Sequence, residues 1–262
     1  MAEAVPVYSG PAPAIRKIEL DRPWRWLAAG WQDMRRTPAV SYAYGALAAI
    51  SGYVLTFGLW ASGLIYLTLP LVAGFLIVGP ILTVGLYEAS RRGEQGLDTT
   101  LTQALAAFSR NGSQIALMGV ALLLLMFAWV RLAALIFMLY WGLDPPSFED
   151  LVVNTFLRTS ALPFLLLGTA VGGALALLAF SISVVSIPFL LDREDANVID
   201  AIATSFRAVQ TNFAPLLFWG ALIVVFVAAG LLTLYLGLVV VLPLVGHASW
   251  HAYRDLVEMR TV

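Results

Sequence analysis

The stretch QIALMGVALLLLMFAWVRLAALIFMLY, from Gln114 to Tyr140, decides the fold class of this chain. It contains a single charged residue, Arg131, and it exceeds the roughly 20 apolar residues that a helix needs to cross a bilayer. Its apolar residues follow one another without the alternation that a membrane β-strand would show. The stretch therefore predicts a transmembrane α-helix.

The composition of the whole chain supports the same interpretation. Of its 262 residues, 60% are hydrophobic and 12% are charged, whereas soluble domains carry about 25% charged residues. This low charge content excludes a basic nucleic-acid-binding domain, and the net charge of −1 supports no global electrostatic argument for an anionic or cationic partner. The sequence has no cysteine, which also excludes disulfides, thiolate metal sites and cysteine nucleophiles.

Further apolar segments lie on both sides of this stretch. They occupy residues 40–64, 67–89, 114–140 and 162–191, and two adjoining segments within 215–253 meet near residues 235–237. We therefore predict an all-α polytopic membrane protein with six transmembrane helices. Its domain organisation is a disordered cytoplasmic tail at residues 1–20, one six-helix membrane domain at residues 21–258, and a short tail at residues 259–262.

Three internal repeats are predicted, because a short amphipathic segment precedes each pair of apolar segments. The apolar residues of these segments recur at helical spacing: Trp24, Leu27, Ala28, Trp31 and Met34 in the first, Leu101, Leu105 and Phe108 in the second, and Val198, Ile202, Phe206 and Val209 in the third. Each repeat would then consist of an interfacial helix and two spans in the same orientation. The alternative is that any pair of apolar helices with an interfacial lead-in looks alike.

The basic residues predict the orientation. With both termini in the cytoplasm, the outer loops hold only Arg158, and Arg131 lies within the third span. The inner segments hold the rest: Arg16, Lys17, Arg22, Arg25, Arg35, Arg36, Arg91, Arg92, Arg110, Arg193, Arg207, Arg254 and Arg260. This asymmetry follows the positive-inside rule and favours cytoplasmic termini.

Prolines and glycines within the spans are candidate sites of helix kinking and close packing. Pro80, Pro188 and Pro243 each lie in the second span of a predicted repeat, and Pro70 lies near the start of the second apolar segment. Kinks at these prolines either build a cavity or hinge, or serve helix packing alone, and we favour packing. Gly168 and Gly172, four residues apart, predict a close approach of two helix backbones, either within one chain or at a dimer seam, and we favour the contact within one chain.

Arg131 is the charge that lies well inside a span. A charge at membrane depth costs about 2.5–3.5 kcal/mol on insertion scales and usually has a partner or a role. Arg131 therefore either has a function, or extends towards the outer interface, or pairs with Glu149 or Asp150 of the outer loop. We favour the last two interpretations.

His247 and His251 are candidate metal ligands, because residues four apart share one helical face. The pair lacks the glutamate of an HExxH motif, and the chain has no other histidine. The favoured interpretation places both at the headgroup level beside Trp250 and Tyr253, in an interfacial aromatic belt. On that interpretation the pair binds no metal or haem, and replacing both histidines by alanine leaves the protein folded.

Three stretches carry a family resemblance: Trp26–Asp33 (WLAAGWQD), Ser186–Arg193 (SIPFLLDR) and Pro243–Arg254 (PLVGHASWHAYR). They resemble a bacterial family of predicted integral membrane proteins with a domain of unknown function. The resemblance implies a location in the bacterial inner membrane. Some members are labelled cytochrome c oxidase subunit I, but a haem–copper catalytic subunit needs more histidine ligands than the two present here. An accessory role beside a respiratory complex stays open.

The functional hypothesis is a non-catalytic scaffold, assembly factor or accessory subunit, with no catalytic residues and no cofactor. Its expected partners are the lipid bilayer and other membrane-protein subunits. One alternative is a small-solute transporter or channel, with kinked helices lining a small cavity. Another is a haem- or metal-binding respiratory subunit that uses the histidine pair.

Overall fold

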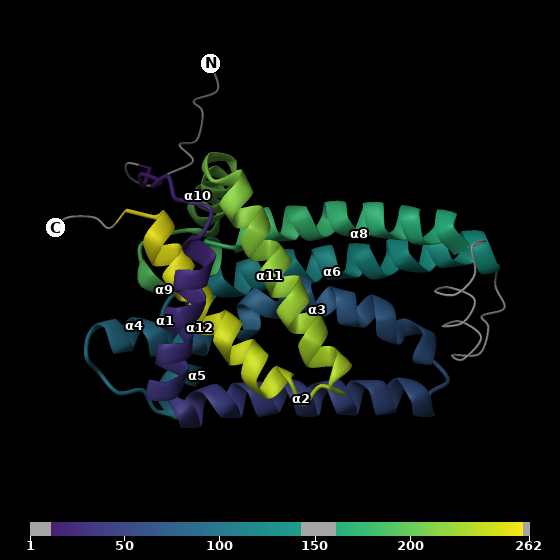
Figure 1. The fold of residues 1–262 in the computed structure, drawn as a ribbon, viewed down its shortest axis with the longest axis horizontal. Coiled ribbons are helices and arrows are strands. Elements are labelled where there is room, and N and C mark those ends of the chain that lie inside the picture. Colours follow the sequence, from purple (N-terminus) through teal and green to yellow (C-terminus); the bar gives the residue numbers. More distant parts are fainter. Residues whose placement is uncertain (1–11, 143–160, 259–262) are drawn as a thin grey trace, which may run out of the picture.

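The computed structural model describes residues 12–142 and 161–258, which form an all-α structure (Figure 1). The first group of helices is α1 (Arg22–Arg36), α2 (Pro38–Ala61), the 3-10 helix η1 (Ile65–Leu67), α3 (Thr68–Leu82) and α4 (Val84–Glu94). The second group is α5 (Leu101–Ala106), the 3-10 helix η2 (Ala107–Ser109), α6 (Gly112–Trp141), α8 (Leu162–Ser183) and α9 (Ser186–Asp192). The third group is α10 (Val198–Thr211), α11 (Phe213–Leu232) and α12 (Leu238–Leu256).

Five helical segments within the described residues are long and apolar enough to cross a membrane. They are Pro38–Ala61, Pro70–Glu94, Gly112–Trp141, Leu162–Asp192 and Phe213–Leu232. The segment predicted as a sixth span, α12, is not among them. The reason lies in its second half, where polar and charged side chains interrupt the apolar run: His247, Ser249, His251, Arg254 and Asp255.

The long helices α2, α3, α6 and α8 run along the longest axis of the molecule, and α11 and α12 cross them diagonally (Figure 1). The shorter helices α1, α4, α5, α9 and α10 gather at one end, which we call the packed end, together with both described chain ends. At this end α1 runs across the direction of α2. A helix in this position lies along a membrane surface if α2 crosses the membrane.

Helix signals in the sequence explain several of these boundaries. Thr100 and Gln103 form a capping box at the start of α5, and the side chain of Asn197 accepts a hydrogen bond from the Asp200 N–H at the start of α10. Pro23 lies in the first turn of α1, where a missing N–H has no cost. These caps fix where the two later amphipathic helices begin.

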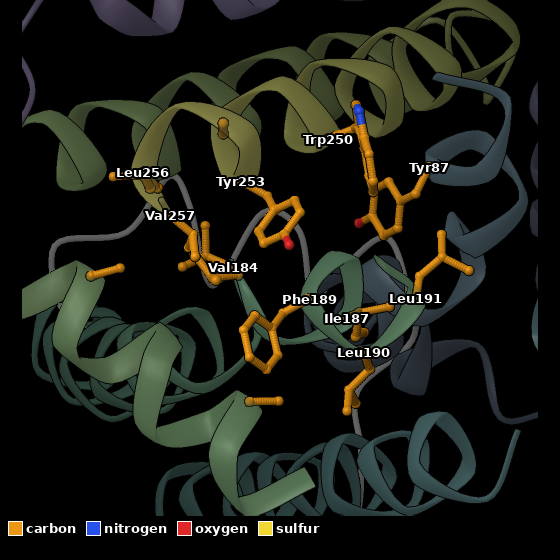
Figure 2. Close-up of a cluster of buried hydrophobic side chains, with 14 of the residues drawn as sticks. Tyr87, Val184, Ile187, Phe189, Leu190, Leu191, Trp250, Tyr253, Leu256 and Val257 are labelled. Atoms are coloured by element: carbon orange, nitrogen blue, oxygen red, sulfur yellow. The ribbon is translucent and has the colours of Figure 1, made fainter. Parts of the chain in front are cut away.

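The densest core lies at the packed end (Figure 2). There α9 contributes Ile187, Phe189, Leu190 and Leu191, and these residues pack against Trp250 and Tyr253 of α12. Trp250 and Tyr253 are 0% and 1% exposed. The prediction of an interfacial aromatic belt at these two residues is therefore wrong, because their rings complete the core instead of facing lipid.

The long helices are much more exposed than this core. Only 17% of the most apolar window of α2 and 11% of that of α6 is buried inside the structure. Their exposed side chains are large and apolar, such as Phe57, Leu124 and Leu139. Such surfaces suit contact with lipid rather than water.

Part of the segment predicted as a disordered tail is held against the end of the chain. The backbone of Arg16 bonds to Leu256, and Ile15 forms an isolated bridge with Val257. The side-chain amide of Asn212 bonds to the backbone of both Arg16 and Ile18. Ordered contacts therefore begin before the first helix, and residues 1–11 lie outside the described part of the chain.

Candidate functional site

The helix α12 organises the packed end, because it lies against α1, α2 and α4. Two glycines allow this close approach. A Cβ atom on Gly30 of α1 would lie 2.7 Å from the backbone nitrogen of Ala248, and a Cβ on Gly45 of α2 would meet the backbone of Val239. Both neighbours are backbone atoms of α12, which cannot move aside as a side chain can.

This packing surrounds a buried polar group, which we call the histidine cluster: Asp33, Ser41, Ser90, His247 and His251. The imidazole of His247 is 0% exposed and lies between two serine hydroxyls. Its Nε2 is 2.9 Å from Ser41 Oγ and its Nδ1 is 2.8 Å from Ser90 Oγ. A neutral imidazole donates through one nitrogen and accepts through the other, so both ring nitrogens are used.

The second histidine of the pair binds an acid. The Nε2 of His251 lies 2.7 Å from Asp33 Oδ2, and the Asp33 side chain is 9% exposed. Burial by itself raises the pKa of the Asp33 carboxyl, but hydrogen bonds from His251 and Ser90 outweigh it. The pKa of Asp33 therefore lies below its ordinary value, and the cluster holds a carboxylate at neutral pH.

Ion pairs fasten the rest of α12 to the packed end. Asp255 accepts hydrogen bonds from Arg22 and from the indole N–H of Trp26, both on α1. Arg254 lies 3.0 Å from Glu94 of α4, which also accepts from the Trp250 indole. The charged residues at the end of α12 thus join it to α1 and α4.

A cavity of about 340 Å³ forms the second candidate site. Its walls come from α3, α8, α11 and α12, with Pro80, Ala176, Gly220 and Gly246 among the residues that line it. Most of the lining is apolar, and the volume lies at the lower end of the range of about 300–1,000 Å³ typical of small-molecule sites. The cavity therefore suits a small lipophilic molecule.

A few hydroxyl groups line the part of the cavity that is nearer the packed end. Thr83, Ser183 and Ser249 each donate to a backbone carbonyl of their own helix, at 3.0, 2.6 and 2.8 Å. The hydroxyl of Tyr87 belongs to the same lining. The side chain of Tyr87 hydrogen-bonds to those of Thr83 and Ser249, so these hydroxyl groups are engaged within the protein.

The three prolines of the predicted repeats differ in their structural roles. Pro80 lies inside α3 and lines the cavity, and α3 ends two residues later, at Leu82. Because proline has no N–H, the Leu76 carbonyl lacks its usual helical partner there. Pro188 lies in the first turn of α9, after the break that follows α8, and Pro243 lies inside α12. Pro70 lies near the start of α3.

The predicted glycine packing site is not a close approach of two backbones within the chain. A Cβ atom on Gly168 would meet nothing within 4 Å, and one on Gly172 would lie 2.9 Å from the ring of Trp129 of α6. Gly172 therefore makes room for an aromatic side chain. Close backbone contacts occur instead at Gly30 of α1 and Gly45 of α2. These two glycines lie on different helices and therefore do not form a GxxxG pattern.

Arg131 lies on the exposed surface of α6. It is 19 residues after the first residue of α6, which places it about 28 Å along the helix. This depth is close to the full hydrocarbon thickness of about 30 Å, so the side chain can reach an interface. Its two predicted partners, Glu149 and Asp150, lie outside the described residues.

Sequence reasoning missed Asp33, Ser41 and Ser90 as partners of the two histidines. One signal was present for Asp33, since it follows Gly30 by three residues and Trp26 by seven, on the buried face of α1. For the two serines the sequence offers no comparable signal. Across residues 12–142 and 161–258, no group of three or more histidine, cysteine, aspartate or glutamate side chains is arranged to hold a metal ion.

Residues 68–192, from the start of α3 to the end of α9, match a family model described as predicted integral membrane protein (DUF2189). The match confirms the resemblance to a family of predicted integral membrane proteins with a domain of unknown function. The fold and the match together define a helical integral membrane protein. No curated protein and no solved structure matches the chain.

Proposed function

We propose that this chain is a non-enzymatic membrane protein that binds a small lipophilic molecule in the cavity between α3, α8, α11 and α12. The observation that carries the proposal is the cavity itself, about 340 Å³ in volume, three of whose four wall helices (α3, α8 and α11) belong to segments apolar enough to cross a bilayer. Its mainly apolar lining favours a lipophilic molecule. Among the hypotheses raised by the sequence, this favours the small-solute transporter or channel.

We further propose six spans arranged as three units. The element order supports the units, because a short helix is followed by two long helical segments in each of the three groups. The contact between α2 and the α11–α12 hairpin supports the sixth span. Tyr235 of that hairpin bonds to Thr56, which is 18 residues after Pro38 and therefore about 27 Å along α2. The hairpin thus reaches about as far as a bilayer is thick.

The proposed orientation places both termini in the cytoplasm of a bacterium, with the packed end on that side. Reporter fusions after Arg92, Arg193 and Arg260 are expected to report the cytoplasm, and a fusion near Pro146 the periplasm. The physical reason is the excess of basic residues on the inner side. A fluorescent protein and a secreted phosphatase, fused in parallel at each site, provide the measurement. A periplasmic signal after Arg260 with a cytoplasmic signal after Arg193 would contradict the sixth span.

The ligand proposal is tested by filling the cavity. Gly173 of α8 lines it, and a Cβ atom there would meet nothing within 4 Å, so Gly173→Leu places a side chain in open space. Gly168→Leu is the matched control, because Gly168 lies on the same helix with equally open surroundings and outside the lining. The probe is 1-naphthol, which combines apolar rings with one donor.

We expect 1-naphthol to raise the thermal unfolding temperature of the wild type and of Gly168→Leu in lipid nanodiscs, and to leave that of Gly173→Leu unchanged. A ligand at 100 times its dissociation constant stabilises the folded state by about 2.7 kcal/mol. An equal response of all three proteins, or no response of the wild type, would contradict the proposal.

The scaffold or accessory-subunit role stays a prediction. It is tested by purifying the protein from its native membrane in mild detergent and identifying any stoichiometric partner by mass spectrometry. A partner that remains bound to Gly173→Leu would show that assembly does not depend on the cavity.

A further inference from the structure

The helix α1 presents two different faces. Trp26, Gly30, Asp33 and Met34 are buried against the bundle. Figure 1 shows α1 in front of α12, on the side of the molecule, so its opposite face points away from the bundle. The sequence predicted that Trp24, Leu27, Ala28, Trp31 and Met34 share one apolar face, but of these only Leu27 and Met34 are buried.

The outer face carries aromatic rings and guanidinium groups together. Trp24 and Trp31 are 54% and 44% exposed, and the Trp24 ring lies 5.8 Å from that of Phe218 on the apolar helix α11. Each residue turns a helix by about 100°. Arg25 and Arg36 therefore lie roughly 100–120° around α1 from Trp24, on the part of the outer face next to the tryptophans. Arg35 lies beside the tryptophans and is exposed.

These arginines differ from several other arginines near the packed end. Arg22, Arg91 and Arg110 bind carboxylates at short distance, and Arg207 donates to a backbone carbonyl. By contrast, the side chains of Arg25 and Arg36 are 62% and 66% exposed, and their nearest carboxylates, on α1 itself or beside it, are 3.7 and 3.9 Å away. The outer face of α1 therefore has positive charge to offer to an external partner.

We propose that the outer face of α1 binds the headgroups of anionic phospholipids in the leaflet at the packed end. Arg25, Arg35 and Arg36 contact the phosphates, while Trp24 and Trp31 lie at the level where headgroups meet acyl chains. Charge complementarity selects this occupant, because a basic amphipathic helix with aromatic residues at a membrane surface attracts anionic lipid. The inference uses the surface position of α1 and is independent of what fills the cavity.

The test compares two lipid probes on the purified full-length protein. Native mass spectrometry measures how much phosphatidylglycerol and phosphatidylcholine stay bound after extraction from nanodiscs that contain equal amounts of both. The variant is the triple substitution Arg25→Gln, Arg35→Gln and Arg36→Gln. The charge-preserving control replaces the same three residues by lysine, and Arg131→Gln removes an exposed arginine from α6.

We expect the wild type, the lysine variant and Arg131→Gln to retain about ten times more phosphatidylglycerol than phosphatidylcholine, and the glutamine variant to show no preference. An undiminished preference in the glutamine variant would overturn the proposal, as would a wild type without preference. Gly173→Leu fills the cavity and leaves α1 intact, so it is expected to keep the wild-type preference. Failure of the cavity proposal is therefore distinguishable from failure of this one.

Discussion

Gly30→Leu is expected to destabilise the protein strongly. A Cβ atom at this position would lie 2.7 Å from the Ala248 nitrogen and 2.9 Å from the Leu244 oxygen. Both are backbone atoms of α12, so α1 would have to move away from α12 as a whole. That movement would also separate Asp33 from His251, and we expect the free energy of unfolding to fall by about 3 kcal/mol.

The matched control for this substitution is Gly58→Leu. Gly58 lies within α2, and a Cβ atom there would meet nothing within 4 Å. Both variants gain the same side chain in a helix, so helix propensity changes equally. Thermal unfolding in detergent, followed by tryptophan fluorescence, measures the difference. A Gly30→Leu protein with the same midpoint as Gly58→Leu would show that α1 and α12 are not packed as described.

The second large effect is expected for His247→Ala. The substitution empties a fully buried site and removes one hydrogen-bond partner from each of the hydroxyls of Ser41 and Ser90. A buried polar group that loses its partner costs about 1–3 kcal/mol, and the cavity adds to this, so we expect a loss of about 3 kcal/mol. The sequence predicted that the protein stays folded when both histidines are replaced by alanine. From the structure we instead expect His247→Ala to be strongly destabilising.

His251→Ala is the natural comparison for this variant. Its side chain is 21% exposed, and water can replace part of its bond to Asp33, so we expect a smaller loss of about 1 kcal/mol. The triple variant His247→Ala, Ser41→Ala, Ser90→Ala should recover part of the stability lost by His247→Ala, because it leaves no unpaired hydroxyl. Equal losses for the two single histidine variants would contradict the structural assignment of a fully buried and a partly exposed histidine.

The candidate sites were only partly visible in the sequence. The spacing of His247 and His251 placed both on one helical side, and that much is correct. Their partners lie 206 and 218 residues away in the chain, at Ser41 and Asp33. Nothing in the local pattern could select those partners, and the neighbouring Trp250 and Tyr253 were assigned to lipid for the same reason.

The cavity, like the histidine cluster, was only partly predictable from the sequence. Pro80 was recognised as a break in the hydrogen bonding of its helix, and the structure places it in the cavity wall. The other walls come from α8, α11 and α12, and their register relative to α3 is set by packing. The predicted backbone contact within one chain at Gly168 and Gly172 was wrong for this reason, since the spacing of small residues does not say which helix they face.

The sequence by itself determined that the chain is all-α and belongs in a membrane, because a helix must satisfy its backbone internally there and long apolar runs reveal it. It also determined which residues share a helical side, because the helix period is a local property. Only the tertiary structure decided which sides meet. In lipid an apolar side gains little by choosing a protein neighbour over an acyl chain, so hydrophobicity carries no information about pairing. Here close backbone contacts at Gly30 and Gly45 and the buried partners of His247 decide it, across distances in the chain that no local pattern spans.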